Sequence, residues 1–432
     1  ELVPSNFDKD IPHNYLSPAF LPIDDLEYDL EKLKVLIQAI GFHHERAKEP
    51  EVKLIKQIIT EELQDKTKEL SQELGGGISD DLISGYTQEL DTRYRIKKDD
   101  KQYALYVLLK GLLHKLDHSA SAHEDIELDI DKHIGEYTEE YMKRFERLRE
   151  VQKFSKNNSD KNLIVVASTG MGKTESALLW INNDKAFFTL PLRVSINALY
   201  DRVSSSEEIG YKYTGLLHST SIDYLEESGY DEGEEIYSQS KLLSKKLTFC
   251  TIDQILKFPF KYRGYEKSYA TLAYSKVVID EIQAYDPEIS AVLLKGLEMI
   301  NDIGGQFMIM TATLPQIYTD YLKEKNIITD EKGAYGEFLN NKIRHKIRVK
   351  KESVLDNANE IIKRAADKKV LVIVNTVDRA IEMFEKLKQT YSDIPINLLH
   401  SMFIKKDRSL LEKQIKNFAD DEEESGIWVT TQ

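Results

Sequence analysis

Ala167-Ser168-Thr169-Gly170-Met171-Gly172-Lys173-Thr174 is the stretch that decides the fold of this chain. The apolar run at 163–166 before it predicts a buried strand, and residues 175–181 after it predict a helix. A strand, a glycine-rich turn and a helix that opens with Gly-Lys-Thr form the setting of a phosphate-binding loop. Glycine lets the backbone N–H groups close around an anion, which the amino end of the helix also attracts. Ala167 departs from the usual pattern, which has Gly there.

The residues of this loop have separate expected tasks. Lys173 is expected to contact the β- and γ-phosphates of ATP, and the Thr174 hydroxyl to hold Mg²⁺. Upstream of the loop, the amide of Gln152 offers both a donor and an acceptor, which suits an adenine edge. The residues predicted to bind the nucleotide are therefore Gln152, Thr169, Gly170, Met171, Gly172, Lys173 and Thr174.

A second element completes the predicted nucleotide site. Val277-Val278-Ile279-Asp280-Glu281 is an apolar strand that delivers two acids at its carboxyl end. Asp280 is expected to hold the metal, and Glu281 to orient or deprotonate the attacking water. An Asp-Glu pair after a strand is in isolation more often a helix start, but its pairing with the phosphate loop favours catalysis. We predict Lys173, Asp280 and Glu281 as the catalytic residues.

Composition sets the broad class of protein. The chain has 432 residues, 41% hydrophobic and 31% charged, which predicts about three soluble globular domains. No apolar run is long enough to span a bilayer, and the first residues of the chain do not resemble a signal peptide. One cysteine excludes an intramolecular disulfide and fits a reducing cytoplasm. The net charge of −15 argues against indiscriminate nucleic-acid binding, although a local basic groove remains compatible with it.

Hydrophobic periodicity predicts three parts, 1–135, 136–350 and 351–432. The first is mostly helical, with helices at 26–42, 51–74 and 103–116, and it ends in an acidic linker at 124–131 that we expect to be a solvated face. The others alternate strands and helices, which predicts parallel sheets. The second begins with a helix at 139–154, and part of 204–246 is expected to be a surface insertion. The third ends on a strand at 427–430 that is expected to lie uncovered. Expected strands are 163–166, 186–190, 247–251, 276–279, 307–310, 370–374 and 396–400, and expected helices of the third part are 355–366, 378–390 and 406–418.

Two further groups of residues could carry chemistry. Thr311 and Thr313 follow a strand, where hydroxyl groups can relay the state of the phosphates or simply cap the next segment. His13, His43, His44 and Asp117 lie in the helical first part and offer ligands that suit a transition-metal pair. Scattered histidines in a helical region are by themselves more often surface or core side chains.

The motifs together resemble a known family. The stretches 167–174, 280–283 and 311–315 resemble motifs I, II and III of a superfamily 2 helicase, although Gln283 stands where His is commoner. The stretches 189–193, 251–254, 374–376 and 429–432 resemble its motifs Ia, Ib, IV and V. The resemblance implies two RecA-like lobes and nucleic-acid-binding or coupling roles for Pro191, Arg193, Thr251, Asp253, Gln254, Thr311, Thr313, Asn375 and Thr376.

The histidines of the first part narrow the resemblance. Pro12-His13-Asn-Tyr-Leu-Ser17, the adjacent His43 and His44, and Asp117 in Leu112-Leu-His-Lys-Leu-Asp117-His-Ser-Ala-Ser121 resemble the HD nuclease fused to the helicase of type I CRISPR systems. The resemblance implies that these four residues hold a metal pair of unspecified identity. It also implies ATP-driven 3′ to 5′ movement on single-stranded DNA, DNA cleavage after recruitment by the Cascade complex, antiviral defence, a cytoplasmic location and no membrane contact.

The expected fold class is a helical HD-type nuclease domain followed by two RecA-like α/β lobes. The first His and the His-Asp pair of the family are expected before residue 1, and the end of the second lobe, with its arginine motif, beyond residue 432. Two alternatives stay open from the sequence. One is a superfamily 2 RNA helicase with a non-catalytic helical first domain, and the other is a nucleotide-binding interaction module without catalysis.

Overall fold

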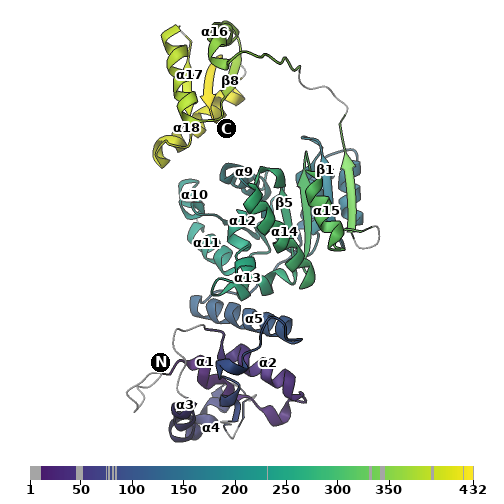
Figure 1. The fold of residues 1–432 in the computed structure, drawn as a ribbon, viewed down its shortest axis with the longest axis vertical. Coiled ribbons are helices and arrows are strands. Elements are labelled where there is room, and N and C mark those ends of the chain that lie inside the picture. The colour runs from purple at the N-terminus through teal and green to yellow at the C-terminus, as the bar shows by residue number, and fades with distance from the viewer. Residues whose placement is uncertain are drawn as a thin grey trace. The chain divides into compact units, whose positions relative to one another are not determined.

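The computed structural model describes residues 11–44, 52–73, 75, 78–79, 82, 85–230, 232–329, 333–340, 346–390, 394–421 and 423–431. The chain divides into two compact units, residues 1–341 and 342–432 (Figure 1). The first unit contains both the helical first part and a large sheet. The second unit begins at 342, ahead of the boundary near 350 that the sequence indicated. No helix among the described residues is long and apolar enough to cross a membrane.

In the described part of the first unit, seven strands form one sheet in the order β3-β4-β2-β5-β6-β1-β7, and every neighbouring pair is parallel. The five strands expected from the sequence are present, and β3 and β7 are additional. β3 lies inside 204–246, so this stretch supplies an edge strand as well as surface helices. The strands are β1 (Asn162–Ala167), β2 (Lys185–Thr189), β3 (Thr214–Leu217), β4 (Leu247–Cys250), β5 (Ser275–Asp280), β6 (Gln306–Thr311) and β7 (Gly333–Phe338).

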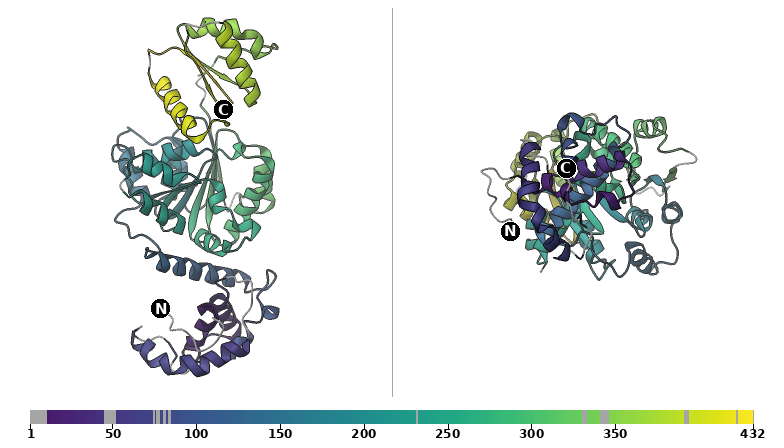
Figure 2. Two further views of the ribbon diagram at one scale, coloured as in Figure 1. Left: turned by 90° about the vertical axis from the view of Figure 1, so that its left-hand side faces the viewer. Right: turned by 90° about the horizontal axis from the view of Figure 1, so that it is seen from below.

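Helices cover both faces of this sheet (Figure 2). Successive side chains of a strand point to opposite faces, so Leu163 and Val165 of β1 enter one core while Ile164 and Val166 enter the other. One face is covered by α6 (Ile134–Met142), α7 (Glu150–Asn157), α8 (Lys173–Ile181), α9 (Arg193–Ser204), α10 (Ser221–Glu227) and α11 (Gly233–Leu242). The other is covered by α12 (Ile252–Ile255), α13 (Tyr265–Leu272), α14 (Pro287–Asp302) and α15 (Gln316–Glu324).

The prediction of a single helix at 139–154 is wrong, because two helices, α6 and α7, occupy this stretch. α6 ends at Met142, and α7 begins at Glu150 after Arg149 in an extended conformation. The Gln152 side chain accepts the backbone N–H of Arg149 at 2.9 Å and so stabilises this new helix start. Both helices contact α8, which the turn between them allows.

The helical first part is built around two longer helices. In α2 (Leu30–Gly41), the Asp29 carboxylate caps the helix start by accepting the Lys32 N–H at 2.8 Å. α5 runs from Tyr103 to Ala122, further than the expected 103–116. The helix expected at 51–74 is interrupted by a π-helical turn over Ile59–Leu63. The remaining α-helices among the described residues of this part are α1 (His13–Leu16), α3 (Val52–Ile58) and α4 (Thr67–Glu73).

α5 packs directly against α13 and thereby joins the helical part to the sheet (Figure 1). The two helices approach so closely at Gly111 that a Cβ there would lie 2.1 Å from the Glu266 carbonyl oxygen. Lys110, the residue directly before Gly111, is buried, and its Nζ donates to Glu266 Oε1 at 2.6 Å. α13 leads directly into β5, the strand that carries Asp280. The contact between α5 and α13 therefore involves the helix that directly precedes this strand.

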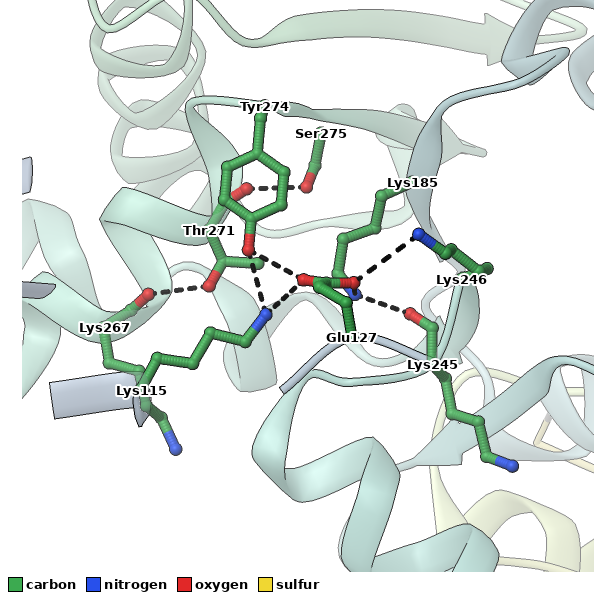
Figure 3. Close-up of polar contacts among 9 residues, drawn as sticks. All are labelled: Lys115, Glu127, Lys185, Lys245, Lys246, Lys267, Thr271, Tyr274 and Ser275. Carbon is green, nitrogen blue, oxygen red and sulfur yellow. Dashed lines mark hydrogen bonds and ion pairs between the residues drawn. The ribbon is translucent and has the colours of Figure 1, made fainter. Parts of the chain in front are cut away.

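The acidic linker at 124–131 is the predicted solvated face only in part, because Asp125, Asp129 and Asp131 are exposed but Glu127 is not. The Glu127 carboxylate pairs with Lys115 of α5 and, at 2.8 Å, with Lys185 at the start of β2 (Figure 3). The Tyr274 hydroxyl donates to the same carboxylate at 2.8 Å. Burial opposes ionisation of Glu127, but attraction to Lys185 and Lys115 prevails and lowers its pKa. Glu127 of the linker therefore neutralises positive charge from the helical part, at Lys115, and from the sheet, at Lys185.

We expect Glu127→Gln to lower the free energy of unfolding of the first unit by about 3 kcal/mol, because it leaves two buried ammonium groups without their counter-charge. Lys115 and Lys185 are only 2% and 3% exposed, so water cannot replace the lost carboxylate charge. Thermal unfolding of the full chain measures this. Asp125→Asn is the matched control, because Asp125 lies on the same linker but is exposed. Equal midpoints for the two variants would contradict a stabilising role of Glu127.

The described residues of the second unit form a three-stranded parallel sheet in the order β8-β10-β9. The last strand is therefore central, and the expectation that it lies uncovered is wrong. Ile427 and Val429 are completely buried between the neighbouring strands and the helices. The elements are β8 (Lys369–Ile373), β9 (Ile396–Leu399), β10 (Gly426–Thr430), α16 (Ala358–Ala365), α17 (Val377–Thr390) and α18 (Lys405–Asp420).

Candidate functional site

The predicted motifs of the first unit gather at one edge of the sheet. The phosphate loop follows β1, the Asp-Glu pair ends β5, and Thr311 ends β6. Because all strands are parallel, their carboxyl ends meet at the same edge, where ligands of open α/β sheets bind. Gly170 and Gly172 have φ values of 79° and 84°, which side chains rarely adopt, and α8 begins at Lys173 directly after them.

Lys173 and the two acids form a charged cluster. The Lys173 ammonium donates to Glu281 Oε1 at 2.9 Å, and Glu281 itself has a left-handed φ of 54°. Burial raises the pKa of Glu281, but hydrogen bonds from Lys173 and Gln283 outweigh this and leave the pKa lowered. Burial raises the pKa of Asp280 to about 6. Its Oδ1 is buried without a hydrogen-bond partner among the described residues, which fits an oxygen that would ligate Mg²⁺.

Gln283 connects the acids to Thr311. Its Nε2 donates to Glu281 Oε2, and its Oε1 accepts the Thr311 hydroxyl. Thr311 Oγ1 in turn lies 3.1 Å from the backbone nitrogen of Thr313, which donates to it. An amide offers a donor and an acceptor at once, so Gln283 can bridge these two partners in a way that the sequence alone did not reveal.

A pocket of about 720 Å³ lies over the phosphate loop. Its wall includes Gln152, Gly170, Gly172, Lys173 and Thr174, all predicted to contact the nucleotide, while Thr169 is exposed at the loop tip. A Cβ at Gly172 would lie 2.5 Å from Gln152 Nε2, so the amide rests against the loop. Because Gln152 Oε1 already accepts the Arg149 N–H, its NH₂ group is the one directed to the loop.

Three cations that line this pocket, Arg147, Arg149 and Arg202, were not found from the sequence. Arg149 donates through Nη1 to the carbonyl of Gly170, and Arg202 pairs with Glu175 of α8. Arg149 lies three residues before Gln152, and that short spacing is a signal that could have suggested it. Arg202 comes from α9, and no local pattern in the sequence links it to the loop.

The second cluster is in the helical part. The structure brings His13, His43, His44 and Asp117 together, with one ligand atom from each within 4.8 Å of the others. His13 begins α1, the two histidines follow the end of α2, and Asp117 lies on α5. The Asn14 side chain donates to the Gly41 carbonyl and so fixes α1 beside the end of α2. Ser17 donates to the His13 carbonyl at 2.9 Å, which explains the spacing of the His-x-x-x-Ser pattern.

The ring orientations in this cluster fit metal ligands. His43 Nδ1 lies 2.6 Å from the Ile40 carbonyl, which requires an N–H at that nitrogen and leaves Nε2 with its lone pair. His44 Nε2 lies 3.2 Å from Asp117 Oδ2. Burial is the main cause that lowers the pKa of His43, so the neutral ring that a metal needs is favoured. Three imidazoles and a carboxylate are a donor set suited to a transition metal.

The residues predicted to contact nucleic acid fall into separate places. Pro191 and Arg193 follow β2, and Thr251, Asp253 and Gln254 follow β4. Because β2 and β4 are adjacent and parallel, both groups lie at the same edge as the nucleotide motifs. Asn375 and Thr376 are exposed after β8 in the second unit. Residue 432 of the predicted last motif lies outside the described residues.

Comparisons with known proteins agree with this geometry. Residues 149–321 match the DEAD/DEAH box helicase family, and residues 366–432 match the family described as CRISPR-associated nuclease/helicase Cas3, C-terminal. The CRISPR-associated nuclease/helicase Cas3 of Methanothermobacter thermautotrophicus is 30% identical over 362 residues, 79% of this chain and 43% of that protein. The class that fold and site define is thus the DEAD/DEAH box helicases.

Two solved structures share the fold. A crystal structure of T. fusca Cas3-AMPPNP covers 99% of this chain and 59% of its own, with a TM-score of 0.64 and 15% identity. A second structure, described as a CRISPR RNA-guided surveillance complex, pre-nicking, matches 99% of this chain and 56% of its own chain, with a TM-score of 0.53 and 15% identity. Within the helicase class, the chain belongs to the Cas3-type family. The chain spans less than half the length of the curated relatives it matches.

Proposed function

We propose that the protein is an ATP-dependent translocase on single-stranded DNA that also carries a metal-dependent DNA nuclease. It would act in type I CRISPR interference, in the cytoplasm, after recruitment by a Cascade-type complex. The contact of Lys173 with Glu281 beside the unpartnered Asp280 oxygen is the observation that carries the ATPase part of this proposal. The His13, His43, His44 and Asp117 cluster supports the nuclease part.

The ATPase role of each side chain follows from its position. Lys173 would exchange its contact with Glu281 for the β- and γ-phosphates, which frees the Glu281 carboxylate to orient the attacking water. Asp280 and Thr174 would hold Mg²⁺, which when bound neutralises charge on the transferring phosphoryl group. Arg149 and Gln152 would help to shape the nucleotide pocket.

In the nuclease part, the four side chains would hold a transition-metal pair, which when bound activates water and stabilises the leaving oxygen. The Ile40 carbonyl would keep the His43 ring oriented, because it fixes the N–H at Nδ1. The names of the relatives support the CRISPR context, and the fold likeness to a surveillance-complex component supports the proposed partner.

The test is nucleotide hydrolysis by the full-length protein with single-stranded DNA, single-stranded RNA or no nucleic acid, together with cleavage of DNA in the presence and absence of added Mn²⁺ or Co²⁺. Stimulation by DNA and metal-dependent cleavage are the expected results. Stimulation by RNA without cleavage would instead identify an RNA helicase with a non-catalytic first part. No hydrolysis at all would leave a nucleotide-binding module and overturn the proposal.

We expect Gln283→Ala to lower DNA-stimulated ATP hydrolysis about tenfold while changing the unstimulated rate much less. The substitution removes the amide that joins Glu281 to Thr311, but it leaves Lys173 and both acids in place. The measurement is the ratio of stimulated to basal turnover. Gln283→Glu keeps the size but loses the donor, so it should also reduce stimulation. An unchanged ratio in both variants would show that the bridge does not couple the two motifs.

A further inference from the structure

The segment Lys257-Phe-Pro-Phe260-Lys261-Tyr262-Arg263-Gly264 joins α12 to α13 and has no role in the motifs described above. It alternates cations with aromatic residues, and no acid occurs between Asp253 and Glu266. Such a basic segment is unusual in a chain with a net charge of −15. Lys257, Lys261 and Arg263 are all exposed, and neither Lys257 nor Arg263 has an ion pair with any described residue.

Two rings of this segment lie in solvent. Phe260 is 55% exposed and Tyr262 is 65% exposed, and the rings stack on each other with centroids 5.6 Å apart and planes at 26°. Exposed apolar side chains are ordinary when they occur singly, but a stacked pair flanked by three cations is not. An exposed aromatic face combined with unpaired cations is the chemistry that binds bases and phosphates of a single strand.

The structure holds this segment in place. Phe258 is completely buried and stacks on Tyr269 of α13 at 4.9 Å, which anchors one end. At the other end, the hydroxyl groups of Tyr265 and Tyr103 lie 2.9 Å apart. Lys261, which lies between Phe260 and Tyr262 in the sequence, has a left-handed φ of 52°. This backbone conformation costs energy for a residue with a side chain. The exposed rings thus belong to a fixed loop rather than to a frayed end.

The segment also connects two sites already described. It begins directly after Thr251 to Gln254, which follow β4 at the motif edge of the sheet. It ends at Gly264, where a Cβ would lie 3.1 Å from the His114 ring of α5. The His114 ring is 6.1 Å from that of His44 in the proposed metal cluster. Lys257 also lies near Lys267 of α13, because burial first, and then repulsion from neighbouring lysines that include Lys257, lowers the pKa of Lys267 to about 8.

We propose that residues 257–264 form a stacking platform that binds single-stranded DNA between the helicase motifs and the histidine cluster. Phe260 and Tyr262 would stack with bases, while Lys257 and Arg263 would contact phosphates. This inference rests on the proposed function, because it assumes that single-stranded DNA is the ligand. It assigns binding residues that none of the helicase motifs includes.

The experiment measures binding of labelled oligothymidine, about 15 nucleotides long, to the full chain by fluorescence anisotropy over a series of salt concentrations. Phe260→Ala combined with Tyr262→Ala should weaken binding at least about tenfold. An abasic strand of the same length should bind this variant and the unmodified protein equally, because it has phosphates but no bases. Lys257→Gln combined with Arg263→Gln should weaken binding of both strands and reduce the salt slope by about 1 to 2.

Tyr94→Ala is the matched control, because Tyr94 is 58% exposed beside Arg93 but lies elsewhere on the helical part. It should bind DNA as the unmodified protein does. An aromatic double variant that keeps its thermal stability and its affinity for oligothymidine overturns the platform and leaves the proposed function intact. Failure of the unmodified protein to bind any single strand overturns the proposed function and the platform with it.

Discussion

Lys173→Ala is expected to lower ATP hydrolysis by at least about a hundredfold, or roughly 2.7 kcal/mol of transition-state stabilisation. The side chain is only 12% exposed and is held at the carboxyl edge of the sheet by its contact with Glu281. Removing it deletes the positive charge that would face the transferring phosphoryl group. It also leaves Glu281 without that cation, so the proton affinity of Glu281 should rise. Steady-state turnover with saturating single-stranded DNA measures the loss.

The second measurement on this variant separates the two proposed sites. Metal-dependent nicking of single-stranded DNA without ATP should persist in Lys173→Ala, because His43, His44 and Asp117 lie in the helical part. Lys153→Ala is the matched control, since Lys153 lies on the neighbouring α7 but is half exposed and pairs with Glu150. The control should hydrolyse ATP normally. Joint loss of hydrolysis and nicking in a folded Lys173→Ala protein would contradict the division into two sites.

Asp117→Ala should abolish metal-dependent DNA cleavage and leave ATP hydrolysis intact. Asp117 supplies the carboxylate among the four ligands and lies 3.2 Å from His44 Nε2, so its loss removes both a negative charge and a ligand. Cleavage with added Mn²⁺ or Co²⁺ is the activity readout. Isothermal titration of the same metals into the full chain is a second readout that does not depend on DNA, and we expect metal affinity to fall by about ten- to a hundredfold.

The alternative for Asp117 is that it only supports packing of α5. Asp129→Ala is a suitable control, because Asp129 is an exposed acid on the linker that follows α5. If Asp117→Ala lowers the thermal midpoint but keeps the metal affinity of the unmodified protein, Asp117 is a structural residue. If cleavage is unchanged, Asp117 does not belong to a nuclease site.

Local patterns determined much of this protein. The strand before the phosphate loop, the loop itself and the Asp-Glu pair at the end of β5 could be predicted, because parallel strands buried on both faces appear as short apolar runs. The order of Gly, Lys and Thr is required by phosphate chemistry and needs no knowledge of distant residues. The positions of β2, β4 and β6 followed from the same kind of run.

Long-range packing decided the rest. Glu127 looked as solvated as the other acids of its linker because an acid shows no preference for a partner in the sequence, and only the fold brings Lys115 and Lys185 to it. The last strand looked uncovered because strand order is a tertiary property, and it places β10 between β8 and β9. Whether His13, His43, His44 and Asp117 meet could likewise not be derived from spacing, since three separate helical segments position them. Sequence periodicity reports burial and local conformation, whereas pairing between distant side chains depends on how the elements pack.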